Sequence, residues 1–286
     1  MAAPAPQQGV MAVTIVAISR ELGSGGTTVA AAVAKELGFR SVDREVILKA
    51  AEAHHVPAEK LDEVDERRLT FWERFDEEKR RFLVFIESAF YAQAEEGNVV
   101  MVGRGGPLLL QGVSHALRAR VMAPFDVRVR RVMEEYKLES KAAATRVRTY
   151  DREQLARQEY LFGVDWTSPE HYDYVINTAE GAWAHYVEAL VMLARSSRYQ
   201  ATPESLQKIR DLSLASRVRA TLAADPATKN IDMGVTARDG VISLRGVVFS
   251  PAMMETVVEA ARQVPGVRNV TTEAVEVPQM YPGPIM

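Results

Sequence analysis

The chain has 286 residues, a formal net charge of -3 and no cysteine, and apolar residues make up 47% of it. This length predicts two domains with real cores, while the near-neutral charge argues against nonspecific nucleic-acid binding as the main role. The lack of thiols excludes disulfides and thiolate metal sites, and no apolar run approaches the roughly 20 residues that span a bilayer, so we expect a cytoplasmic protein without a transmembrane segment.

The first predicted elements follow a tail, residues 1–10, that is rich in Ala, Pro and Gln. A β-branched apolar run over 13–18 predicts a strand, and an alanine-rich pattern over 29–37 predicts a helix that Gly38 ends. The turn between them is rich in glycine. Strand, glycine turn and helix are the setting of a phosphate-binding loop, because backbone N–H groups and the helix N-terminus then converge on an anion.

This turn fits the pattern G-x-x-x-x-G-K-[ST] from Arg20 to Thr27, with two disagreements. Arg20 stands where the first glycine belongs, and Gly26 replaces the lysine. On local spacing alone, a glycine-rich turn without a ligand is an equally good interpretation. The residues predicted to hold the phosphates of a nucleotide are Gly23, Ser24, Gly25, Gly26, Thr27 and Thr28.

Further strands are predicted at 39–42, 98–102, 116–122 and 174–176, and helical segments separate them. This alternation is typical of an α/β fold with a parallel sheet. A charged helical region over 60–96 carries an apolar stripe. The stripe consists of Leu69, Trp72, Phe75, Phe82, Phe85 and Phe90. It indicates either core packing or packing between two copies of the chain, so a homo-oligomer stays open.

Polar residues follow the second and third predicted strands. Asp43 and Arg44 come after one, and Arg104, flanked by glycines, comes after the other. Ligands of open parallel sheets bind beyond the carboxyl ends of the strands, so we predict that these three residues bind the substrate. For Arg104, an ordinary surface arginine in a turn is the alternative.

Arginines and lysines are concentrated in a helical stretch over 128–160 that has no Pro or Gly. As a group they suit a lid that brings positive charge to a transferring phosphoryl group, although a solvated pair of basic helices fits any single one of them. The five histidines show no metal-ligand spacing. We therefore predict no protein-held metal, only Mg²⁺ carried on a nucleotide, with Thr27 as a hydroxyl contact.

Seven short motifs in order give the first two hundred residues a family resemblance. They are Ile-Ser-Arg-Glu-Leu-Gly-Ser-Gly-Gly (18–26), Val-Asp-Arg-Glu (42–45), Val-Gly-Arg-Gly-Gly (102–106), Arg-x-Arg-Arg (128–131), Asp-Arg-Glu (151–153), Phe-Gly-Val-Asp-Trp (162–166) and Tyr-Asp-Tyr-Val-Ile-Asn-Thr (172–178). Together they resemble the cytidylate kinase-like family, which also carries glycine at the loop lysine position.

The resemblance implies ATP with Mg²⁺ as cofactors and CMP or dCMP as the default acceptor. It also implies that the catalytic arginines of the lid are Arg148, Arg152 and Arg157. Because the loop has no lysine, Arg20 and these lid arginines would have to provide the missing charge, so we predict Arg20 as a further catalytic residue. One departure concerns Gly105, which stands where the similar Gly-Arg-Asp motif of CMP kinases has an aspartate. The role of the arginine carries over to Arg104, but the reading of the acceptor base does not.

After a predicted linker at 199–205, the order α-β-β-α-β over 206–277 predicts a small second domain, and 278–286 is a tail. An Asp-Gly hairpin turn at 239–240 and the Pro-Gly-Val turn at 265–267 make this domain resemble the BON domain. That resemblance implies a lipid, small-molecule or protein ligand and no catalytic residue. The balanced charge of the domain argues against strong attraction to anionic lipid.

The predicted fold is therefore α/β, a parallel sheet like that of P-loop nucleoside monophosphate kinases with a helical lid at 11–198, followed by a small α+β domain. We predict an ATP-dependent kinase that acts on a nucleoside monophosphate. The alternative is a nucleotide-binding regulatory protein with little or no turnover, whose C-terminal domain reports occupancy. Loss of the loop lysine favours the alternative, and the basic lid favours the kinase.

Overall fold

The computed structural model describes residues 13–51, 77–181 and 183–276. The strands are β1 (Ile15–Arg20), β2 (Arg40–Val42), β3 (Val99–Val102), β4 (Ala116–Met122), β5 (Tyr174–Asn177), β6 (Met233–Arg238), β7 (Val241–Val247) and β8 (Asn269–Glu276). The α-helices are α1 (Gly26–Leu37), α2 (Arg44–Ala51), α4 (Glu77–Glu95), α5 (Gly106–Leu109), α6 (Phe125–Tyr136), α7 (Ser140–Phe162), α8 (Trp183–Arg195), α9 (Pro203–Ala224) and α10 (Pro251–Arg262). Two 3₁₀ turns, η3 (Pro169–His171) and η4 (Ser197–Tyr199), complete the described elements.

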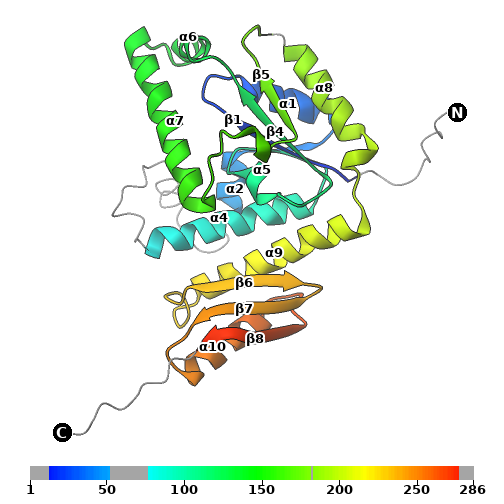
Figure 1. Cartoon of the computed structure of the whole chain (residues 1–286), viewed down its shortest axis with the longest axis vertical. Coiled ribbons are helices and arrows are strands. Elements are labelled where there is room, and N and C mark those ends of the chain that lie inside the picture. The colour runs from blue at the N-terminus through cyan, green and yellow to red at the C-terminus, as the bar shows by residue number, and fades with distance from the viewer. Residues whose placement is uncertain (1–12, 52–76, 182, 277–286) are drawn as a thin grey trace, which may run out of the picture. The chain divides into compact units, whose positions relative to one another are not determined.

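A five-stranded parallel sheet with the order β2-β3-β1-β4-β5 forms the first part of the chain (Figure 1). The chain runs from β1 to one side of this strand and later returns to its other side. Such a reversal of strand order places ligands outside the carboxyl end of the strands concerned. The turn after β1 is therefore where the topology expects a ligand.

The core of this sheet lies between its central strands and the helices α1 and α8. Val16 and Ile18 of β1 are fully buried together with Val29 and Val33 of α1 and Leu190 of α8. Gly38 ends α1 in a left-handed conformation, and its N–H donates to the carbonyl groups of Ala34 and Lys35. The core thus fixes α1, and with it the glycine turn, against the end of β1.

The predicted elements are confirmed as strands and helices in the predicted order, with shifts of a few residues at their ends. The fold class is also confirmed, both for the parallel sheet and for the small second sheet of order β6-β7-β8. The predicted tails 1–10 and 278–286, and the part of the helical region that precedes α4, including Leu69, Trp72 and Phe75, lie outside the described residues. Among the residues described, no helix combines the length and the apolar character needed to cross a membrane.

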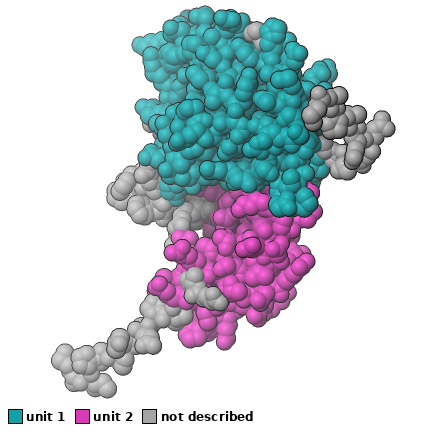
Figure 2. All heavy atoms as spheres, turned by 45° about the vertical axis from the view of Figure 1, so that its right-hand side comes forward, with its two compact units in different colours: residues 1–43, 96–205 teal, residues 44–95, 206–286 magenta. Residues whose placement is uncertain are grey.

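The chain divides into two compact units, shown in teal and magenta in Figure 2. Unit 1 consists of Met1–Asp43 and Glu96–Ser205, and unit 2 of Arg44–Glu95 and Leu206–Met286. Unit 2 therefore combines α2 and α4, which precede β3 in the chain, with the C-terminal elements. The domain boundary at 199–205 stays a prediction, because the division into compact units also separates residues 44–95 from the rest of the first two hundred residues.

The predicted linker is attached to unit 1 at its start. The hydroxyl of Thr14 donates to the carbonyl oxygen of Tyr199 at 2.9 Å, and the N–H of Ala201 donates to the carbonyl oxygen of Val13 at 3.1 Å. Tyr199 is buried. Helix α9 then begins at Pro203.

Helix α9 has two buried faces. Leu214, Val218 and Leu222 belong to the core that α9 shares with α10 and the second sheet. A second buried stripe at helical spacing consists of Ile209, Ser213, Ser216 and Ala220. Within unit 2, α4 runs alongside α9 (Figure 1), which accounts for two faces being covered.

An ion pair joins these two helices. Arg219 Nη2 of α9 donates to Glu87 Oε1 of α4 at 2.7 Å. Burial and the neighbouring Glu87 raise the pKa of Tyr91 on α4 well above its ordinary value, although Arg219 opposes this. The helix that precedes β3 and the C-terminal domain therefore form one packed body.

Candidate functional site

The glycine turn between β1 and α1 has the backbone of an anion-binding loop. Gly23 and Gly25 have φ angles of 75° and 77°, which only glycine adopts at little cost. The hydroxyl of Ser24 donates to the carbonyl oxygen of Glu21 at 2.7 Å and accepts from the N–H of Gly26 at 3.3 Å. Gly26 begins α1, so the positive end of the helix dipole faces the loop.

Arg131 of α6 and Thr178, which follows β5, hold this loop through its carbonyl groups. Arg131 Nη1 donates to the carbonyl oxygens of Gly23 and Ser24 at 3.3 and 3.4 Å. The hydroxyl of Thr178, fully buried, donates to the Ser24 carbonyl at 2.6 Å, and Arg131 binds the carbonyl of Thr178 at 2.7 Å. Because C=O and N–H of a trans peptide point in opposite directions, the N–H of Gly25 points away from this clamp, while the N–H of Ser24 donates to the carbonyl oxygen of Glu21 at 3.1 Å.

Trp183, the first residue of α8, covers the same loop. A β-carbon on Gly25 would overlap its indole ring. The guanidinium carbon of Arg131 lies 4.8 Å from the centre of that ring, in the range of a cation–π contact. Burial, followed by the charge of Arg130, lowers the pKa of Arg131. The indole ring of Trp183 thus packs against Gly25 and is in contact with Arg131.

Glu21, the first residue of the turn, joins an ionic network. Its carboxylate pairs with Arg120 at 2.8 Å and with Arg128 Nε at 3.3 Å. Arg128 in turn donates to both carboxylate oxygens of Asp151 on α7, at 2.8 and 2.9 Å. Burial opposes the charge on Arg128, but the Asp151 hydrogen bond and the two carboxylates raise its pKa. The network connects the glycine turn to α7.

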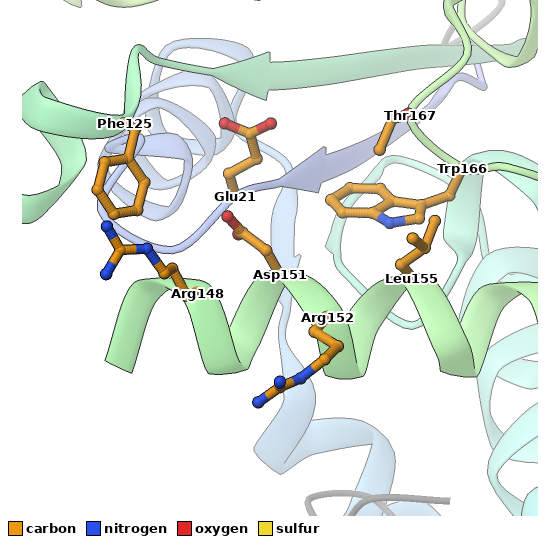
Figure 3. A pocket seen from close by; sticks show the side chains of 8 residues that line it. All are labelled: Glu21, Phe125, Arg148, Asp151, Arg152, Leu155, Trp166 and Thr167. Carbon is orange, nitrogen blue, oxygen red and sulfur yellow. The ribbon is translucent and has the colours of Figure 1, made fainter. Parts of the chain in front are cut away.

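A pocket of about 470 Å³ lies beside this network (Figure 3). It is lined by Glu21, Phe125, Arg148, Asp151, Arg152, Leu155, Trp166 and Thr167. Figure 3 shows Asp151 pointing from α7 toward Glu21, with Phe125 and Trp166 on either side. Trp166 is buried and stacks on Arg120 at 4.9 Å. The pocket therefore offers aromatic walls, carboxylates and arginines within reach of the loop.

The predicted lid arginines occupy different settings. Arg148 and Arg152 line this pocket and are exposed, and Arg148 lies over the Phe125 ring at 4.8 Å. Arg157 is only 8% exposed and does not line the pocket. Arg20 lies next to α7, because its Nη1 donates to the Tyr150 hydroxyl of that helix at 3.1 Å.

The turn after β3 has an unusual backbone. Gly103, Arg104 and Gly105 have consecutive positive φ angles of 82°, 59° and 68°. For a non-glycine residue this conformation is strained by roughly 1–2 kcal/mol, which is often seen at functional sites. A β-carbon on Gly105 would lie 2.6 Å from the ring of Phe162. Phe162 therefore fills the space that an aspartate at this position would need.

The remaining predicted residues lie at other strand and helix ends. Asp43 is exposed directly after β2, while Arg44 begins α2 and its side chain lies outside what the structure describes. Thr27 and Thr28 are exposed in the first turn of α1. Among the described residues, no group of three His, Cys, Asp or Glu side chains is arranged to hold a metal ion.

Sequence reasoning missed the residues that support the loop from other elements. Arg131 was noticed only as one basic residue of the predicted lid and of a family motif, Thr178 only within a family motif, and Trp183 carried no signal. Glu21 lies inside the loop pattern at a position that accepts any residue. Their roles depend on contacts between segments about a hundred residues or more apart, which local spacing does not reveal.

The fold and the loop define a P-loop α/β protein of the kinase type. A family model described as the cytidylate kinase-like family matches residues 15–180, which is more than half of the chain. The chain therefore belongs to the cytidylate kinase-like family. A second model, the BON domain, matches residues 210–279, so the C-terminal domain is a BON domain.

The chain is also similar to individual proteins. The chain is 26% identical over 166 residues to a cytidylate kinase of Methanopyrus kandleri, covering 55% of this chain and 80% of that protein. A crystal structure of an uncharacterized protein from Eubacterium ventriosum aligns with a TM-score of 0.50 and 20% identity, over 64% of this chain and 99% of the other. That likeness concerns the fold alone. A 35% identical stretch of 92 residues matches uronate isomerase of Corynebacterium glutamicum but spans only 18% of that enzyme and 32% of this chain.

Proposed function

We propose that this protein transfers the terminal phosphoryl group of ATP to a nucleoside monophosphate, with CMP or dCMP as the first acceptor to test. The observation that carries the proposal is the phosphate loop, with left-handed glycines at 23 and 25 and carbonyl groups clamped by Arg131 and Thr178. The cytidylate kinase of Methanopyrus kandleri supports the choice of acceptor. The BON domain is proposed as a binding module without catalytic residues.

In this proposal the donor phosphates lie on the loop from Gly23 to Thr28. Mg²⁺ arrives with the nucleotide, and the exposed hydroxyl of Thr27 fits the role of holding it. The ion would neutralise phosphate charge. Arg148 and Arg152 supply positive charge from the lid, while the buried Arg157 positions α7. Asp43, Arg44 and Arg104 bind the acceptor.

The test is an ADP-release assay with ATP, Mg²⁺ and each common nucleoside monophosphate in turn. The kinase proposal expects one acceptor, CMP or dCMP first, to raise ADP production well above the rate without acceptor. ATP binding without stimulation by any acceptor would favour a regulatory nucleotide-binding protein. The observation in favour of that alternative is that the loop has no room for the usual lysine at position 26.

Arg131→Met is expected to weaken ATP binding roughly 10- to 100-fold, because it removes charge-assisted hydrogen bonds to the loop carbonyls. The measurement is calorimetric titration with ATP and Mg²⁺. Arg130→Met is the matched control, since Arg130 is exposed on the same helix. Equal affinities in the two variants would contradict the clamp.

Arg104→Ala and Arg104→Gly are both expected to lower turnover with the acceptor about 10- to 100-fold while ATP affinity stays near normal. The two variants separate chemistry from backbone strain. Glycine should be the more stable of the two by about 1 kcal/mol, since alanine keeps the left-handed strain at φ 59°. Thermal unfolding and separate titrations of donor and acceptor measure this. An equal loss for both ligands would place Arg104 on ATP or in the scaffold.

A further inference from the structure

The two positions at which the loop departs from G-x-x-x-x-G-K-[ST] are in direct contact. A β-carbon on Gly26 would overlap the Cβ atom of Arg20 and lie 3.1 Å from its Cγ atom. The Cβ atom of Val121, on the neighbouring strand β4, would lie 3.2 Å away and closes the other side. A lysine at position 26 and an arginine at position 20 therefore exclude one another.

We infer that Arg20 replaces the loop lysine and is a catalytic residue that contacts the transferring phosphoryl group. The inference rests on the proposed function. Arg20 occupies the first position of the motif, and its Cβ and Cγ atoms lie against Gly26. Its guanidinium group then supplies the positive charge to the phosphoryl group. On this basis the two departures belong together: the cation is at position 20 in place of the glycine, and the glycine is at position 26 in place of the lysine.

The position of the guanidinium supports this role. Arg20 Nη1 donates to the hydroxyl of Tyr150 on α7 at 3.1 Å. The same atom lies 3.1 Å from where a β-carbon on Gly103 would be, so a side chain at 103 would displace the guanidinium. The head group thus lies between the phosphate loop, the turn that carries Arg104, and the lid helix. This is the space between the proposed donor and acceptor sites.

The chemistry requires a cation there. In the proposed step, an oxygen of the acceptor phosphate bonds to the γ-phosphorus while the bond from that phosphorus to the bridging oxygen breaks, and the electron pair leaves with ADP. A nucleotide phosphate is largely deprotonated near pH 7, since its second pKa is about 6, so the step needs no base. A guanidinium has five N–H donors, so after Tyr150 takes one the fork retains donors for phosphate oxygens.

The test is an exchange experiment in the full chain with three variants: Arg20→Gly, Gly26→Lys and Arg20→Gly/Gly26→Lys. Each single change is expected to lower turnover by about 100-fold, one by losing the cation and the other by overlap. The double variant has the standard G-x-x-x-x-G-K-T pattern without the overlap. We expect it to recover to within about tenfold of the unmodified protein. A double variant no better than the poorer single variant would overturn the inference.

Two further variants separate charge from packing. Arg20→Met keeps the stem over Gly26, so it should unfold at the same temperature as the unmodified chain and still lose about 100-fold in turnover. Arg20→Lys should restore part of that loss, which a purely structural role would not predict. Normal turnover of Arg20→Met would refute the inference outright.

The same variants are titrated with ATP and Mg²⁺ by calorimetry, which keeps this inference separate from the choice of acceptor. If no acceptor supports turnover, the proposed kinase function fails, but weaker ATP binding in the single variants and recovery in the double variant would still support the exchange. If turnover occurs and the exchange gives no recovery, the inference fails while the kinase function stands.

Discussion

Gly25→Val is expected to abolish detectable ATP binding while the chain stays folded. Gly25 has a φ angle of 77° at the N-cap of α1, and any β-carbon there would overlap the Trp183 ring. Either the loop backbone or Trp183 must move, and both are part of the proposed phosphate-binding site. We expect titration with ATP and Mg²⁺ to give no measurable heat, with an unfolding free energy lower by a few kcal/mol.

The opposite end of the same helix provides the control. Gly38 also has a left-handed backbone, with φ 68°, but a β-carbon there would meet nothing within 4 Å. Gly38→Val therefore carries the same kind of backbone strain without touching the loop, and should keep normal ATP affinity at reduced stability. Similar ATP affinities in the two valine variants would show that the turn after β1 is not the phosphate site.

Much of unit 1 could be predicted because its signals are local. Gly38 ends α1 as expected, and the unbroken apolar run of β3 forms a fully buried strand. The loop was also recognisable, since its glycines lie between a strand and a helix. The exact chemistry of the loop could not be predicted. That a side chain at position 26 would overlap Arg20 depends on how the first turn of α1 packs against the end of β1.

The support of the site could not be predicted for a related reason. Glu21, Arg128 and Asp151 are separated by many residues, and each alone is typical of a solvated helix or turn. They form an ionic network only when α6 and α7 pack on the end of the sheet. The assignment of α4 is a similar case, because its charged sequence fits a solvated helix face, whereas its pairing with α9 depends on residues more than a hundred positions away.

Truncation of the chain after Ser205 is expected to destabilise α2 and α4 severely, although the sequence favoured a first domain that folds independently. Unit 2 contains Arg44–Glu95 together with Leu206–Met286, so the truncation removes the larger part of this compact unit. The buried apolar side chains of α4 include Phe85, Ile86 and Phe90. Each of these side chains that the truncation exposes costs about 1.5–3 kcal/mol, against a typical stability of about 5–15 kcal/mol.

Amide hydrogen exchange and thermal unfolding measure this effect, with α4 expected to exchange fast in the truncated chain while β1 and β4 retain protection. A point variant tests the same interface in the full chain. Arg219→Met breaks the ion pair with Glu87, which is partly exposed on both sides, and should cost about 1 kcal/mol and speed exchange in α4. Arg245→Met, at an exposed arginine of β7 in the same unit, should do neither. Full protection of α4 after truncation would mean that the C-terminal domain does not stabilise it, and α4 would then have to be assigned to unit 1.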